Sequence, residues 1–278
     1  MLQEIIKKDK SEPFLRWAGG KGWLIKFIND YIPETFNNYH EPFLGGGAIF
    51  FHLAPSKKYY LSDLNEELIN TYIQIRDNVD EVIIELKKHV NSETHYYQVR
   101  RTDPKSDLGR AVRFIYLNKT SFNGIYRVNS NGGYNVPYGF RKSADIVNGS
   151  CLLSVSLQLK KATLKTQDFG ESLSKVKKGD LVFLDPPYTV AHENNGFISY
   201  NQKIFSLNDQ KRLARWVEKI NELGAYYILT NAKHKGIKEI YSQINEPMTV
   251  YRSSTIGGKG AQRGKINEYL FTNISKPV

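Results

Sequence analysis

The chain has 278 residues, of which 40% are hydrophobic and 13% aromatic, enough to build a packed core. Thirty-nine Lys and Arg residues against 28 Asp and Glu residues give a net charge of +11, which favours a polyanionic partner. A single cysteine excludes an internal disulfide and a zinc site built from cysteines. No apolar run approaches the roughly 20 residues of a membrane span, and the first residues are charged, so we expect a cytoplasmic protein without membrane association.

The first third of the chain alternates strand and helix patterns. We predict a strand at 39–44, a glycine turn, a helix at 48–53, a strand at 58–61 and an amphipathic helix at 64–75. This alternation is typical of an α/β domain with helices packed against a sheet.

The alternation stops between Asn78 and Ile146. Charge-mixed helical patterns cover 79–90 and 96–118, and a loop rich in Asn, Gly and Tyr follows them. We therefore predict an inserted module at 78–146, mainly helical and carrying a β-hairpin loop.

Strand and helix patterns resume after the insertion. The predicted elements are strands at 163–166 and 181–184, a helix at 207–223, a strand at 225–230, a helix near 237–244, and strands at 249–251 and 269–272. The predicted fold class is α/β: a Rossmann-like core formed by 1–77 and 147–278, interrupted by the module at 78–146.

The sequence DPPY at 185–188 directly follows the apolar strand 181–184. Two prolines cannot continue a sheet ladder, so the chain leaves the sheet at the carboxyl end of the strand, where open α/β sheets bind ligands. The Asp185 carboxylate and the Pro186 carbonyl can both accept hydrogen bonds from one planar amino group, while the Tyr188 ring covers its face. This arrangement suits a reaction at the exocyclic nitrogen of a base. A plain strand-ending turn is the alternative.

The glycine cluster Gly45-Gly46-Gly47 follows one predicted strand, and Asp63 ends the next. Glycines there let a ligand approach the backbone, and an acid at that strand end typically binds ribose hydroxyls. The cluster departs from the dinucleotide fingerprint, because Phe50 occupies the third glycine position. A nucleoside cofactor without a pyrophosphate fits best, and S-adenosylmethionine is the expected one. A plain turn is the alternative for the glycines alone.

A basic, aromatic and amide-rich loop lies between Asn118 and Arg141, with no acidic residue from Lys119 to Lys142. Arginine reads guanine edges with two hydrogen bonds, asparagine binds adenine or phosphate, and aromatic rings stack on unpaired bases. The loop therefore predicts a nucleic acid as the partner. A solvated hairpin would show the same composition.

Several segments together resemble the Dam family of DNA adenine-N6 methyltransferases, in the family order and over about residues 14–272. They are FLRWAGGK at 14–21, FLGGG at 43–47, Asp63, NGIYRVN at 123–129, YNVP at 134–137 and DPPY at 185–188. The resemblance implies a class I methyltransferase core, an inserted target-recognition module and methylation of adenine N6 in double-stranded DNA, with GATC as the expected target.

The resemblance also implies roles for individual residues. In the catalytic turn these are Asp185, Pro186, Pro187 and Tyr188. S-adenosylmethionine contacts are expected from Trp17, Lys21, Phe43, Gly45, Gly47, Asp63, Asp168, Phe169 and Asp185. DNA contacts are expected from Arg16, Lys119, Phe122, Asn123, Ile125, Arg127, Asn129, Asn135, Pro137 and Arg141.

Within the expected DNA contacts, the resemblance makes Arg127 the reader of the first guanine of GATC and Ile125 and Pro137 contacts to thymine methyl groups. Phe122 would fill space near a base flipped out of the duplex. Relatives carry Gly-Arg-Tyr where this chain has Gly139-Phe140-Arg141, which shifts the expected phosphate contact by one residue.

Two other functions fit the same motifs. One is the same chemistry on an RNA base or a protein glutamine, against which the basic module argues. The other is a catalytically silent DNA-binding protein, against which the intact DPPY argues. The chemistry needs no metal, and a cognate restriction endonuclease is a candidate partner.

Overall fold

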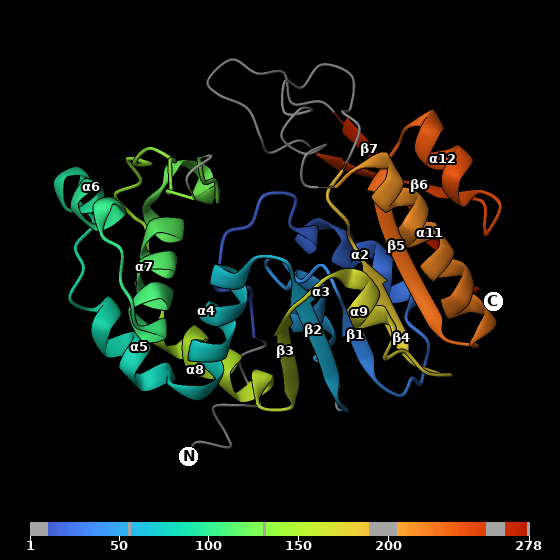
Figure 1. Cartoon of the computed structure of the whole chain (residues 1–278), viewed down its shortest axis with the longest axis horizontal. Helices are drawn as coiled ribbons and strands as arrows, with labels where there is room; N and C mark the ends of the chain where they lie inside the picture. The colour runs from blue at the N-terminus through green and yellow to red at the C-terminus, as the bar shows by residue number, and fades with distance from the viewer. Residues whose placement is uncertain (1–10, 55–56, 130–131, 189–204, 254–264, 277–278) are drawn as a thin grey trace. The chain divides into compact units, whose positions relative to one another are not determined.

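The computed structural model describes residues 11–54, 57–129, 132–188, 205–253 and 265–276 (Figure 1). Seven strands hydrogen-bond in the order β3-β2-β1-β4-β5-β7-β6. They are β1 (Tyr39–Glu41), β2 (Tyr59–Asp63), β3 (Ala162–Thr166), β4 (Leu181–Leu184), β5 (Tyr226–Ala232), β6 (Met248–Ser253) and β7 (Lys265–Thr272). The mixed sheet and its strand order confirm the predicted α/β, Rossmann-like fold class.

Most of the longer helices begin after a residue whose side chain caps them. Side chains of Asn65, Ser92, Ser106, Asn148, Asp168 and Ser206 each accept a hydrogen bond from a backbone N–H in the first turn of the helix that follows. The α-helices are α2 (Ile25–Ile28), α3 (Ala48–Leu53), α4 (Glu66–Asp77), α5 (Val79–Leu86), α6 (Glu93–Arg101), α7 (Asp107–Thr120), α8 (Gly149–Leu159), α9 (Phe169–Leu173), α11 (Leu207–Glu222) and α12 (Lys235–Tyr241). Short 3-10 helices are η1 (Lys21–Leu24), η2 (Asn29–Tyr31) and η3 (Phe122–Gly124). None of the described helices is long and apolar enough to cross a membrane.

The chain forms two compact units, which are described separately. Unit 1 comprises Met1–Gly22, Leu44–Ser56 and Leu61–Gln167, and unit 2 comprises Trp23–Phe43, Lys57–Tyr60 and Asp168–Val278. The predicted insertion at 78–146 lies wholly within unit 1.

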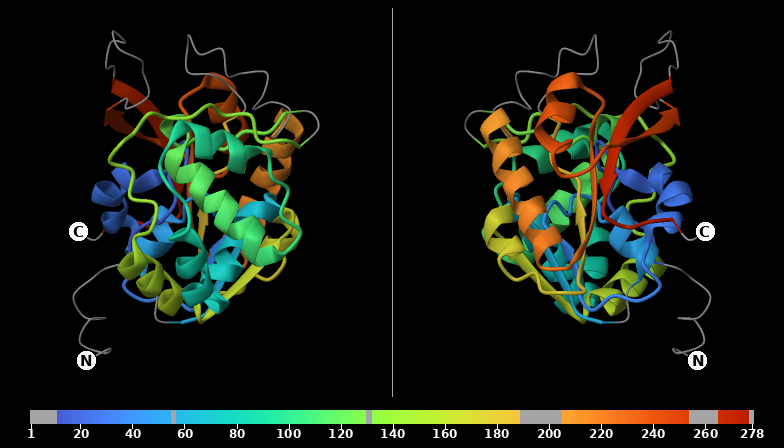
Figure 2. Two further views of the ribbon diagram at one scale, coloured as in Figure 1. Left: turned by 90° about the vertical axis from the view of Figure 1, so that its left-hand side faces the viewer. Right: turned by 90° about the vertical axis from the view of Figure 1, so that its right-hand side faces the viewer.

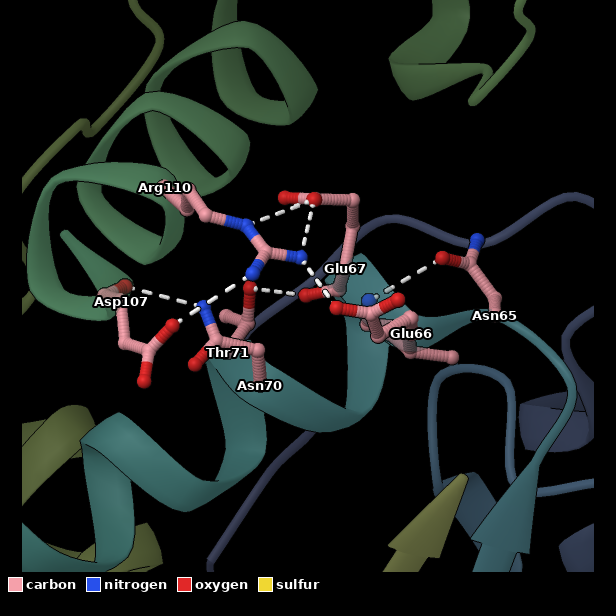
Figure 3. Close-up of polar contacts among 8 residues, drawn as sticks. Asn65, Glu66, Glu67, Asn70, Thr71, Asp107 and Arg110 are labelled. Atoms are coloured by element: carbon pink, nitrogen blue, oxygen red, sulfur yellow. Dashed lines mark hydrogen bonds and ion pairs between the residues drawn. The ribbon is translucent and has the colours of Figure 1, made fainter. Parts of the chain in front are cut away.

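Unit 1 is built around α4 and α7, which pack against each other and against α5 and α8. In the left view of Figure 2 this helical group faces the viewer. An ion-pair cluster joins the two central helices: Arg110 of α7 donates to Glu66 at 2.7 Å and to Glu67 at 2.8 Å (Figure 3). The Asn70 side chain of α4 donates to the Asp107 carbonyl at 2.9 Å. These bonds fix the orientation of α7. Its carboxyl end leads into the loop between Asn118 and Arg141, which is the predicted recognition loop.

Unit 2 contains the strand pairs that position the DPPY turn. β1 and β4 are parallel, β4 and β5 are parallel, and β7 runs antiparallel between β5 and β6. Helices α9 and α11 lie over one face of β4 and β5 (Figure 1). Buried side chains of α9, α11 and α12 form one apolar cluster with those of the two strands, which includes Leu213, Val217, Tyr227, Leu229 and Tyr241. Burial of these apolar surfaces supplies the main stabilisation of the unit.

The strand order changes direction between β1 and β4, both of which have their carboxyl ends in unit 2. Ligands in open α/β sheets bind outside the carboxyl ends of the strands at such a switch point. Phe43 follows β1 and Asp185 follows β4, so the fold places two predicted site residues there.

Some predicted boundaries are wrong for identifiable reasons. The strand predicted at 39–44 ends at Glu41, because Pro42 lacks the N–H that a ladder needs. The helical patterns at 79–90 and 96–118 form three helices, and Pro104 lies in the break between α6 and α7. The helices α8 and α9 had no predicted counterpart.

Candidate functional site

The DPPY turn begins where β4 ends, with Asp185 held by the neighbouring strand. The register pairs Leu184 of β4 with Leu229 of β5, which brings Thr230 beside Asp185. The Thr230 hydroxyl, on a fully buried side chain, donates to Oδ1 of Asp185 at 2.8 Å. Asp185 itself is half-buried. The bond fixes the plane of the carboxylate at the edge of the sheet.

The other residues of the turn are held by the sheet and by β7. Pro186 is buried, whereas Pro187 and Tyr188 are half-buried. The Tyr188 hydroxyl donates to the carboxylate of Glu268, a buried residue of β7. The predicted catalytic residues are thus a continuous turn anchored at its acid and at its aromatic ring.

The predicted ribose-binding acid lies beside the glycine turn in unit 1. Oδ2 of Asp63 accepts a hydrogen bond from the Gly45 N–H at 3.0 Å, and Oδ1 accepts one from Asn65 at 3.0 Å. Burial raises the pKa of Asp63 above its usual value, and the backbone hydrogen bonds partly oppose this rise. Gly45 and Gly47 both have positive φ, at 48° and 65°. The turn therefore presents a sheltered carboxylate next to close-packed backbone.

Trp17 and Lys21 also lie in unit 1, next to this turn. A methyl group added at Gly45 would lie 2.8 Å from the Trp17 indole, so the glycine allows the ring to pack on the turn. The same indole stacks on Tyr126 of the recognition loop with ring centroids 6.1 Å apart. Lys21 is 4% exposed, and its ammonium donates to the Gly19 carbonyl at 3.2 Å.

Unit 2 holds the remaining predicted cofactor residues. The Phe43 and Phe169 rings lie 5.5 Å apart, and Phe169 is buried. Arg212 of α11 binds both carboxylate oxygens of Asp168, at 2.9 and 2.8 Å. The same guanidinium lies 4.1 Å over the Phe169 ring. Arg212 thus fixes Asp168 and Phe169, both of which were predicted to contact S-adenosylmethionine.

The predicted hairpin is a short loop closed by backbone hydrogen bonds. Asn135 donates its N–H to the Arg127 carbonyl at 3.1 Å, and Asn129 donates to Gly133 at 2.9 Å. The isolated bridge between Val128 and Tyr134 replaces a longer strand ladder. The exposed Arg127 guanidinium donates from Nε to the Asn135 side chain at 2.8 Å, which orients the side chain predicted to read guanine.

The predicted DNA contacts all lie in unit 1. Burial lowers the pKa of Lys119, and Arg141 and Arg16 lower it further; Arg16 shows the same pattern, with burial as the larger cause and Arg141 as the second. These three cations therefore form one basic cluster. Arg16, Lys119, Ile125 and Asn135 are half-buried, and Phe122, Asn123, Arg127, Asn129, Pro137 and Arg141 are exposed.

Asn118, near the end of α7, connects the amino-terminal segment to the recognition loop. Its side chain accepts from the Arg16 N–H at 2.9 Å and donates to the carbonyls of Arg16 at 2.7 Å and Gly124 at 3.1 Å. Gly124 has φ of 64°, and a methyl group there would lie 2.4 Å from Cβ of Arg16. The contact between these segments therefore requires glycine at this position.

Four residues at these sites were not predicted from the sequence: Thr230, Glu268, Arg212 and Asn118. Thr230 ends the strand that was predicted at 225–230, so the rule that sites gather at carboxyl strand ends points to it. Glu268 directly precedes the apolar run 269–271, and glutamate is rarely buried, so its place at the start of that run is the one available signal. Arg212 and Asn118 lie within helices and carry no comparable local signal. In the described part of the chain, no group of three or more His, Cys, Asp or Glu residues could hold a metal ion.

Comparison with known proteins agrees with this geometry. Residues 17–255 match the family model of D12 class N6 adenine-specific DNA methyltransferases. The Type II methyltransferase M1.LlaDCHI of Lactococcus lactis subsp. cremoris is 37% identical over 97% of this chain and 98% of its own length. Type II methyltransferase M.MjaIII of Methanocaldococcus jannaschii is 35% identical over 80% of this chain and 84% of its own. The DNA adenine methylase of Escherichia coli strain K12 is 30% identical over 94% of this chain and 95% of its own length. The chain belongs to the D12 class of N6 adenine-specific DNA methyltransferases.

Proposed function

We propose that this adenine-specific DNA methyltransferase uses S-adenosylmethionine and acts on the adenine of GATC after the base has left the duplex stack. The observation that carries the proposal is the DPPY turn, with the Asp185 carboxylate oriented by Thr230 at the carboxyl end of β4. The target amino group is inaccessible inside a duplex, so enzymes of this kind flip the base out.

The residues of unit 1 fit the proposed cofactor in their chemistry. The Asp63 carboxylate is an acceptor suited to the two hydroxyl donors of a ribose, and its shelter from water strengthens such bonds. The buried Lys21 ammonium suits a carboxylate such as that of the methionine portion. When bound, S-adenosylmethionine supplies a methyl group on a positively charged sulfur.

The adenine amino nitrogen is a weak nucleophile because its lone pair is delocalised into the ring. The Asp185 carboxylate and the Pro186 carbonyl each accept a hydrogen bond from the amino group. These bonds draw the nitrogen toward tetrahedral geometry, which localises its lone pair. Tyr188 stacks on the flipped base. As the N–C bond forms, the bond from the methyl carbon to sulfur would break and its electron pair would remain on sulfur, which becomes neutral. The positive charge would then lie on the base until the N6 proton departs to solvent. The protein contributes position and electrostatics.

The recognition loop supports GATC as the target. Arg127 is exposed and oriented by Asn135, as a bidentate reader of guanine needs to be. The basic cluster of Arg16, Lys119 and Arg141 suits the phosphate backbone. The Type II methyltransferases among the relatives further support a cognate restriction endonuclease as a partner.

The direct test is transfer of labelled methyl from S-adenosylmethionine to duplex oligonucleotides in which each base of GATC is replaced in turn. We expect label only on adenine and a sharp loss of rate for every replacement. 2-Aminopurine at the target position should gain fluorescence as it leaves the stack. Equal labelling of GATC and its variants would contradict the proposed specificity, and absence of labelling would contradict the cofactor.

A matched pair of variants tests the role of Arg127. Arg127→Ala should weaken the binding free energy for GATC by about 1–3 kcal/mol and should relax discrimination at the first base alone. Arg141→Ala removes an exposed cation of the basic cluster and should weaken all sequences alike, with a salt dependence flatter by about one charge. If Arg127→Ala slows methylation of every substrate by the same factor, Arg127 contacts the DNA backbone and not a base.

A further inference from the structure

Glu268 is a buried carboxylate within the sheet of unit 2. It is 1% exposed, and its neighbours in the register are Ala232 of β5 and Val250 of β6, both of which are buried. Burying a charged carboxylate costs several kcal/mol unless hydrogen bonds compensate it. An apolar residue would be more stable at such a position, so the acid requires an explanation.

Tyr188 supplies that explanation, because its hydroxyl donates to Oε2 of Glu268. The prolines before Tyr188 restrict the backbone at one end of the side chain, and Glu268 holds the hydroxyl at the other. The ring of Tyr188 is therefore fixed at both ends. The hydroxyl is the donor in this bond, and an ionised carboxylate is the strongest acceptor for it.

We propose that Glu268 is a positioning residue that holds the Tyr188 ring for stacking on the target adenine and makes its face more attractive to positive charge. The inference rests on the proposed stacking of Tyr188. Methyl transfer to a neutral amino group leaves a positive charge on the base, and an aromatic face attracts a cation. An anion bound to the phenol increases the electron density of that face, so the effect is strongest when the charge develops.

The test uses Glu268→Gln, Glu268→Leu, Tyr188→Phe and the double variant Tyr188→Phe with Glu268→Leu. Tyr241→Phe is the matched control, because its buried hydroxyl donates to the Gln210 side chain at 2.8 Å within the same unit. For each protein, single-turnover methylation rate, KM for DNA, 2-aminopurine fluorescence and Tm are measured.

Glu268→Gln keeps an acceptor and loses the charge, so its methylation rate should fall about 2- to 30-fold, the range of a cation–π contribution, with little change in KM. Glu268→Leu and Tyr188→Phe each leave a partner without its bond and should lower both Tm and rate. The double variant replaces both polar groups by apolar ones, so Tm should recover. Its rate should stay low, because neither the anchor nor the charge returns.

Recovery of the wild-type rate along with Tm in the double variant would show that the pair is only structural. An unchanged rate in Glu268→Gln would also overturn the role of the charge. Because all rates are ratios to the wild-type protein on its best DNA substrate, a protein with no methylation at all would contradict the proposed function instead. Tyr241→Phe should change Tm without a selective loss of rate.

Discussion

Replacing Thr230 by valine removes one hydroxyl while keeping the shape of a fully buried side chain. Oδ1 of Asp185 then loses a donor at 2.8 Å. Hydrogen bonds to charged groups contribute about 1.5–3 kcal/mol, which corresponds to about 10- to 150-fold in rate. Asp185 is half-buried, so water partly replaces the hydroxyl, and we expect about 10- to 30-fold. The loss should appear in the single-turnover methylation rate, with KM for DNA nearly unchanged.

Thr230→Ser, which keeps the hydroxyl, should retain most of the rate. Thr272→Val is a second control, because the buried Thr272 hydroxyl donates to the Tyr227 carbonyl in the same sheet, at 2.6 Å. That variant should lower Tm without a selective effect on rate. A Thr230→Val protein that methylates at the wild-type rate would refute the assignment, as would equal rate losses in Thr230→Val and Thr272→Val.

Three further predictions concern the cofactor, the recognition loop and pH. Asp63→Ala should weaken S-adenosylmethionine binding about 10- to 150-fold in calorimetry and leave DNA affinity unchanged; unaltered cofactor binding would contradict the ribose contact. Gly139→Ala would place a methyl group 2.5 Å from the Ser121 carbonyl oxygen and should raise KM for DNA at least several-fold, with cofactor affinity as the control. Burial alone would raise the pKa of Asp180, but hydrogen bonds from His40 and the backbone lower it. The lowered pKa stabilises the folded protein fully above the usual aspartate pKa, and this stabilisation is lost as the pH falls through the lowered value. Asp180→Asn should therefore reduce the free energy of unfolding in urea by about 3 kcal/mol at pH 7, and the reduction should shrink as the pH is lowered below the usual aspartate pKa.

The elements that carry the chemistry could be predicted from the sequence because their signals are local. An apolar run ending in two prolines predicts both β4 and the turn after it, and the structure places Asp185 directly at the end of that strand. The amphipathic pattern of α4 and the apolar stripe of α11 likewise needed only neighbouring residues.

The partners of the site residues could not be predicted in this way, because they come from distant parts of the chain. Thr230 lies 45 residues after Asp185, and Glu268 lies 80 residues after Tyr188. Arg212 reaches Asp168 from 44 residues away. Strand register and helix packing bring these pairs together, and neither is encoded in a short motif.

The Asn118 side chain links the segment that contains Trp17, a predicted cofactor contact, to the loop that is predicted to bind DNA. It binds the backbone of Arg16, whose neighbour Trp17 stacks on Tyr126 of the recognition loop. Trp17 is a predicted cofactor contact and the loop is predicted to read DNA, so a cofactor that orders Trp17 should also stabilise one arrangement of the loop. Coupling of this kind is reciprocal, so correct DNA should tighten cofactor binding by the same factor as the cofactor tightens DNA binding. DNA of another sequence would not tighten cofactor binding. The enzyme would then discriminate between DNA sequences through its affinity for the methyl donor as well as through contacts to the bases.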